Sequence, residues 1–208
     1  MHRMKHGPRL GAAGAIVAIV LFFSSTIPAQ IPSRTASQAP KGPWTDKNLS
    51  PDQRAALLVE QMTLDEKIGL LHGTGMGFGP GGAPTRSLGG AGFVPGIPRL
   101  GIPDIQLADS AVGVTRGASR SRYSTALPSN VSEACSWNLK LATEYGALIG
   151  RELRDQGFNM SLGGGVNLMI DPRNGRNFEY KGEDPILAGK LAGHEMKSLQ
   201  AQGVMGHI

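Results

Sequence analysis

Residues 158–189 read FNMSLGGGVNLMIDPRNGRNFEYKGEDPILAG and contain the features that decide the fold. The apolar start predicts a short strand, and a helix signal follows the charged loop at Asp184 and Pro185. Aspartate is a favoured N-cap residue, and proline suits the first helical position because its missing N–H would have no partner there. A strand, a polar loop and a helix in this order are typical of one unit of a parallel α/β protein.

The same alternation continues on both sides of this segment. A strand is predicted at 102–109, a helix from Asn138 to a stop at Gly157, and a third strand at 204–208. The order β-α-β-α-β predicts neighbouring parallel strands joined by right-handed crossovers. In such proteins functional groups gather beyond the carboxyl ends of the strands. We therefore expect Asp109 and the DPRNGR loop to meet at one rim.

The region before these units predicts two short helices and a long loop. Each helix begins with a capping box, at Ser50 and at Thr63, where a glutamine or glutamate three residues on completes the pair. Residues 73–101 are dominated by glycine and proline and predict a loop. A literal GxGxxG beginning at Gly77 is rejected as a nucleotide fingerprint because it follows a helix, contains Pro80 and lacks a preceding strand.

The amino terminus has the pattern of an export signal. Residues 1–29 combine three basic residues and no acid with a short apolar run and small residues near the end. An uncleaved membrane anchor is the alternative, but the apolar run is short for a span. Residues 30–49 are polar and proline-punctuated and predict a linker. We expect a secreted or periplasmic protein without stable membrane association after cleavage.

Charge, cysteine and histidine content exclude several classes of protein. The net charge is +5, of which the predicted signal contributes +3, so the remainder offers no basic patch for nucleic acid. Cys135 is the only cysteine, which rules out an intrachain disulfide, and its surroundings predict a buried small apolar residue. The histidines lack metal-ligand spacing, so no metal site and no cofactor is expected.

Four stretches occur in the order found in one enzyme family. They read LLVEQMTLDEKIGLL, GIPRLGIPDIQLADSAVGV, ALPSNVSEACSWN and GGGVNLMIDPRNGRNFEYKGEDPILAGKLAGHEMKSLQAQGVMGHI. Residues 50–208 thereby resemble the N-terminal part of glycoside hydrolase family 3, whose best-known members are exo-acting β-glucosidases. The resemblance implies a TIM-type (β/α)₈ barrel, of which this chain would supply about the first three β/α units.

The resemblance also implies a sugar-binding pair, Asp109 and Arg176. Relatives carry a D-G-P-x-G-V-type motif where this chain reads D-S-A-V-G-V, so the aspartate is retained and the small residues after it differ. A carboxylate can accept hydrogen bonds from two vicinal hydroxyls, and a guanidinium donates several in a fixed fork. We expect Arg173, Asp171 and Glu179 to brace the loop.

Two other interpretations of the charged loop are weaker. Asp171 and Glu179 could form the carboxyl pair of a retaining glycosidase. Each has an arginine beside it, however, which favours a permanently ionised carboxylate over a general acid. Lys181 and Glu183 are expected to be solvated, and Asp184 is expected to act only as a helix cap.

The resemblance further implies groups that these 208 residues do not contain. In relatives the last strand runs into a Lys-His pair that contacts the sugar, and the aspartate nucleophile and the acid/base glutamate come later still. We therefore expect an exported, retaining, β-glucosidase-like hydrolase acting on β-glucosides or oligosaccharides from non-reducing ends. The chain itself would be an inactive, truncated fragment. The alternative is a non-catalytic sugar-binding protein.

Overall fold

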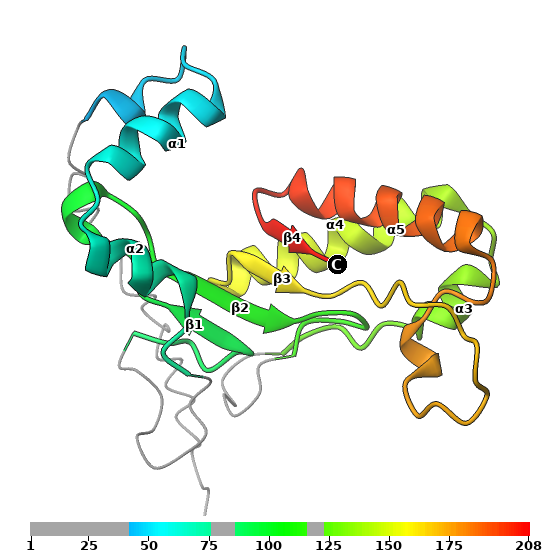
Figure 1. Ribbon diagram of the computed structural model, residues 1–208. Coiled ribbons are helices and arrows are strands. Elements are labelled where there is room, and N and C mark those ends of the chain that lie inside the picture. Colours follow the sequence, from blue (N-terminus) through cyan, green and yellow to red (C-terminus); the bar gives the residue numbers. More distant parts are fainter. Residues whose placement is uncertain (1–41, 76–85, 116–122) are drawn as a thin grey trace, which may run out of the picture. The chain divides into compact units, whose positions relative to one another are not determined.

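The computed structural model describes residues 42–75, 86–115 and 123–208. The predicted signal peptide, most of the predicted linker and the GxGxxG match lie outside these residues. The described chain is a mixed α/β fold around one four-stranded sheet with the order β1-β2-β3-β4 (Figure 1). Within the described residues, none of the helices is long and apolar enough to cross a membrane.

The sheet confirms the three predicted strands and adds a fourth. β2 (Ile105–Asp109), β3 (Met160–Leu162) and β4 (Met205–His207) pair in parallel. β1 (Gly92–Val94) pairs antiparallel with β2, inside the segment for which the sequence predicted only a loop. The register places the last residues of β2, β3 and β4 side by side, so that their carboxyl ends form a single edge.

Two long helices connect the parallel strands, as predicted. In α4 (Leu139–Gln156), the Asn138 side chain accepts from two backbone N–H groups at the start, and Gly157 ends the helix with a left-handed conformation. In α5 (Pro185–Gln200), Asp184 caps the first turn in the same way. The two helices pack closely against each other (Figure 1). The main core lies between these helices and the strands, and its buried members are Ala108, Val114, Tyr145, Ile149, Leu153, Phe158, Leu199 and Val204.

The amino-terminal helices also form as predicted. α1 (Pro51–Glu60) and α2 (Leu64–Leu71) both begin with complete capping boxes. A second small core joins them to the 3-10 turn η2 (Pro98–Leu100), through Met62, Ile97 and Leu100. Arg99 of this turn pairs with Glu66 of α2.

Two predictions about side-chain exposure are wrong. Cys135 follows the short helix α3 (Asn130–Ala134) and is exposed, because it occupies the cap at the helix end rather than an inward face. Lys181 was expected to be solvated but is completely buried, since two carboxylates from distant parts of the chain surround its ammonium group.

Candidate functional site

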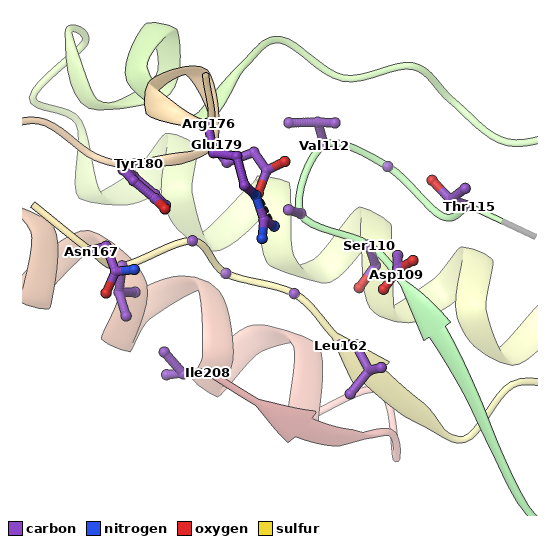
Figure 2. Close-up of a pocket in the computed structure, with 16 residues that line it drawn as sticks. Asp109, Ser110, Val112, Thr115, Leu162, Asn167, Arg176, Glu179, Tyr180 and Ile208 are labelled. Carbon is purple, nitrogen blue, oxygen red and sulfur yellow. Dashed lines mark hydrogen bonds and ion pairs between the residues drawn. The ribbon is translucent and has the colours of Figure 1, made fainter. Parts of the chain in front are cut away.

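A cavity of about 670 Å³ lies beyond the carboxyl ends of the parallel strands (Figure 2). Its walls are the loop that follows β2, the glycine-rich loop that follows β3, the segment around η3 (Asn177–Glu179), and Ile208 after β4. Asp109 and Arg176 both line it, although 67 positions separate them in the sequence. The expectation that the two side chains meet at one rim therefore agrees with the geometry.

Asp109 is placed by the last hydrogen bonds of the sheet. It is the final residue of β2, and its carbonyl accepts from the N–H of Thr115 at 2.7 Å, which folds the following loop back on itself. The next residue, Ser110, donates its N–H to Leu162 of β3 at 2.8 Å and shares a buried hydroxyl–hydroxyl bond of 2.6 Å with Ser161. The carboxylate itself stays exposed at the end of the strand (Figure 2).

Gly163 allows these two serines to meet. A Cβ at this position would lie 2.8 Å from the Ser110 Oγ and 3.0 Å from the Ser161 Oγ. Any side chain there would press on the buried hydroxyl pair next to Asp109. The structure accommodates the hydroxyl of Ser110, directly after Asp109, by pairing it with Ser161.

Arg176 is held by its neighbour in η3. Its Nε donates to Glu179 Oε2 at 2.9 Å, and Nη2 bonds the same oxygen. The pKa of the Arg176 guanidinium is raised first by the hydrogen bond and charge of Glu179, and to a smaller extent by the charges of Tyr180 and Asp109. The Asp109 carboxylate is thus close enough for its charge to act on Arg176 across the cavity.

The other arginine of the loop is not part of the cavity wall. Arg173 donates from Nε and Nη2 to the Asp171 carboxylate at 3.1 and 2.9 Å, and the hydrogen bonds lower the pKa of Asp171. Asn177 donates its side-chain N–H to the carbonyl of Asp171 at 2.9 Å. These contacts close the loop upon itself. Each predicted bracing residue is therefore in an ion pair, Arg173 with Asp171 and Glu179 with Arg176.

Sequence reasoning missed three polar members of the wall, Thr115, Tyr180 and Asn167. Hydrogen bonds from the side chains of Asn167 and Asn174 lower the pKa of Tyr180, and the charge of Arg176 adds to this effect. The signal was present in the sequence, because a tyrosine directly follows the residue that binds the cavity arginine. Its proximity to Asn167 depends on how the two loops fold and was not readable.

The described residues contain no cluster of three or more histidine, cysteine, aspartate or glutamate side chains that could hold a metal ion. The cavity instead offers the Asp109 carboxylate, the Arg176 guanidinium with its partner Glu179, the Tyr180 phenol, the Asn167 amide and the Thr115 hydroxyl. These are the groups that bind a neutral, hydroxyl-rich molecule through hydrogen bonds.

A polar cavity beyond the carboxyl ends of parallel strands is the usual ligand site of α/β enzymes. Residues 97–208, more than half of the chain, match the family model described as the glycosyl hydrolase family 3 N-terminal domain. The chain therefore belongs to glycosyl hydrolase family 3.

Curated relatives include the Probable beta-glucosidase F of Emericella nidulans, 34% identical over 171 residues that cover 82% of this chain and 18% of the relative. The Beta-glucosidase 1 of Aspergillus aculeatus is 36% identical over 197 residues, which cover 94% of this chain and 20% of the relative. The chain spans about a fifth of the length of these relatives.

Solved structures show the same likeness. The beta-glucosidase 3B of Thermotoga neapolitana in complex with glucose matches with a TM-score of 0.67 and 36% identity, over 72% of this chain and 22% of that structure. DesR, a beta-glucosidase of Streptomyces venezuelae in complex with D-glucose, matches with a TM-score of 0.63 and 38% identity, over 74% and 18%.

Proposed function

We propose that this chain supplies the sugar-binding wall of a β-glucosidase-like active site. The observation that carries the proposal is the one cavity that both Asp109 and Arg176 line, at the carboxyl edge of the parallel strands. The likeness to family 3 structures solved in complex with glucose supports it. The substrate would be a β-glucoside or a short oligosaccharide bound by its non-reducing sugar.

The two side chains suit complementary parts of a pyranose. The Asp109 carboxylate has two acceptor oxygens for neighbouring hydroxyl groups, and it stands exposed at the cavity edge. Among the described residues, the bonds of the Arg176 side chain use Nε and Nη2, which leaves Nη1 to donate to the sugar. Glu179 fixes the plane of the guanidinium, so less side-chain freedom is lost when the sugar binds.

The reaction would be a retaining double displacement, in which two carboxyl groups about 5 Å apart serve as nucleophile and acid/base. Asp171 and Glu179 are poor candidates for these roles. Asp171 does not line the cavity, and Arg173 keeps its pKa low, whereas Glu179 is bonded to Arg176. We propose that the nucleophile and the acid/base correspond to parts of the relatives that these 208 residues do not match. The chain by itself would bind sugar without cleaving it.

The protein would act outside the cytoplasm, with residues 1–29 as a cleaved signal. Amino-terminal sequencing of the mature protein should then begin close to residue 30. A mature chain that still begins at Met1 would contradict export by cleavage.

Glucose binding by titration calorimetry tests the site directly. Hydrogen bonds to charged groups contribute about 1.5–3 kcal/mol, so Asp109→Ala and Arg176→Met should each weaken glucose binding about 10- to 150-fold. Arg173→Met is the matched control, because this arginine lies in the same loop but outside the cavity wall, and it should leave affinity within about twofold. Unchanged binding in both cavity variants would refute the proposal.

The same variants separate a hydrolase from a non-catalytic sugar-binding protein. Hydrolysis of 4-nitrophenyl β-D-glucopyranoside by the protein as its gene encodes it, lost in Asp109→Ala, supports the glycosidase. Glucose binding that depends on Asp109 without any hydrolysis supports the binding protein.

A further inference from the structure

Three ionisable side chains are buried together next to the cavity wall. They are Lys181, Glu133 and Glu195, with exposures of 0%, 2% and 4%. The Lys181 ammonium is hydrogen-bonded to Glu133 Oε2 and lies 2.7 Å from Glu195 Oε2. We name this set the buried triad. Glu133 belongs to α3, Glu195 belongs to α5, and Lys181 lies in the segment between η3 and α5.

Burying the charges of the triad costs free energy. Removing an ion from water costs several kcal/mol even after the protein relaxes, and an equivalent apolar set is often as stable or more so. The triad also holds one more carboxylate than ammonium groups, and Glu133 Oε1 has no hydrogen-bond partner among the described residues. Burial accordingly raises the pKa of Glu195, against the opposing pull of Lys181. Stability alone does not account for this choice of residues.

The location of the triad suggests what it does. Lys181 directly follows Tyr180, which lines the cavity, and lies two residues after Glu179, which holds Arg176. Its two ion pairs attach this end of the loop to α3 on one side and to α5 on the other.

A second set of buried contacts runs through α3 and α4 toward the Asp109 side of the cavity. Asn130 of α3 donates its side-chain N–H to the carbonyl of Glu179 at 2.7 Å. The Tyr145 hydroxyl of α4 donates to the carbonyl of Pro128 at 2.8 Å. It also lies 3.4 Å from Asn130 Oδ1 and 3.2 Å from the carbonyl of Ala111, in the loop that follows Asp109. The ring of this tyrosine also faces Lys181, with 5.9 Å from the ammonium to the ring centre. Buried polar contacts therefore run from the Glu179 backbone through Asn130 to Tyr145, which lies beside the loop that follows Asp109.

We propose that Lys181 is a positioning residue for sugar binding, and that its ion pairs to Glu133 and Glu195 fix the Arg176 segment at the distance from Asp109 that a sugar requires. This inference rests on the proposed function of the cavity. Lys181 itself does not line the cavity, so it acts through Tyr180, Glu179 and Arg176.

The test replaces the triad without leaving a buried charge. Lys181→Met alone strands two carboxylates and is expected to destabilise the fold strongly. The triple variant Lys181→Met, Glu133→Met and Glu195→Met keeps similar side-chain volumes, and it should melt within a few degrees of the wild type. Lys190→Met is the control, because it removes an exposed lysine of α5.

Two readouts distinguish positioning from a purely structural role. In the triple variant, glucose affinity should fall about 10- to 100-fold, the range in which a displacement of about 1 Å acts. Amide hydrogen exchange should accelerate in residues 171–181 and remain unchanged in α4. Wild-type affinity and wild-type exchange in a folded triple variant would overturn the proposal.

The remaining outcomes also decide the question. If the methionine variants do not fold, Glu133→Gln and Glu195→Gln each remove one ion pair while keeping the shape, and unchanged exchange of residues 171–181 in both would overturn the proposal. If the wild-type protein fails to bind glucose, the proposed function fails. The exchange rates of residues 171–181 then still report whether Lys181 holds the loop.

Discussion

The contact between α4 and α5 depends on Gly146, and Gly146→Ala tests it. A Cβ at this position would lie 2.1 Å from the backbone oxygen of Glu195 and 2.5 Å from the Ser198 Oγ. The serine can rotate away, but the helical carbonyl cannot. Because non-bonded atoms prefer separations of about 3.5 Å, α5 would have to move by about 1 Å or more.

The expected magnitude follows from two opposing effects. Overpacking of a close contact costs about 1–3 kcal/mol, and a clash with backbone belongs at the upper end. Alanine is favoured over glycine inside a helix by about 1 kcal/mol. We expect a net destabilisation of about 2 kcal/mol, which corresponds to about a 30-fold change in the equilibrium between closed and open helices.

Amide hydrogen exchange in α4 and α5 measures this change in the opening equilibrium locally. Gly146→Ala should accelerate exchange about 30-fold in both helices, provided that exchange follows the opening equilibrium. Gly189→Ala is the control, since a Cβ there has nothing within 4 Å and the substitution should slow exchange through helix propensity alone. Equal or slower exchange in Gly146→Ala would mean that the helices do not meet at this glycine.

Three further predictions concern the site and the response to pH. Gly165→Ala should weaken glucose binding measured by calorimetry at least tenfold, because its Cβ would lie 2.1 Å from the carbonyl of Glu179 and would push the Arg176 partner away; undiminished affinity would count against it. Arg99 lowers the pKa of Glu66 to about 2, so this pair stabilises the fold above pH 4.5 and loses its effect as the pH falls toward 2. In Arg99→Met the melting temperature should therefore depend less on pH over that interval. A pH profile identical to that of the wild type would show that the pair contributes nothing. Burial raises the pKa of Glu195 above 4.5, so the contribution of this group to stability is complete below pH 4.5 and is lost as the pH rises through the folded-state pKa. Thermal unfolding scans of Glu195→Gln should lack this decline in stability. If the decline persists, another group causes it.

Local chemistry predicted most of the helices and strands. The caps at Ser50, Thr63, Asn138 and Asp184 are set by residues within a few positions of one another, so the sequence shows them directly. β1 could not be found in this way. Its three residues form a strand because Phe93 is buried and because the neighbouring β2 satisfies their backbone hydrogen bonds.

The candidate site shows the same division. The convergence of Asp109 and Arg176 followed from parallel strand order, since that order alone determines which loops share an edge. The burial of Lys181 did not follow, because Glu133, one of the carboxylates that neutralise it, lies 48 positions away. A lysine beside a glycine in a charged loop looks solvated until the helices around it are assembled.

The position of the two sugar-binding candidates is determined by the sheet and helices more than by their own loops. In the parallel register Asp109 pairs with Leu162, and the hydrogen bond between Ser110 and Ser161 stabilises the same register of β2 and β3. Arg176 is tied to helices through Glu179, whose backbone is held by α3. A slip of one residue between β2 and β3 would move Asp109 to the other face of the sheet, because side chains alternate along a strand. Sugar affinity should therefore respond to substitutions in buried residues such as Ser161 as strongly as to many changes in the exposed loop.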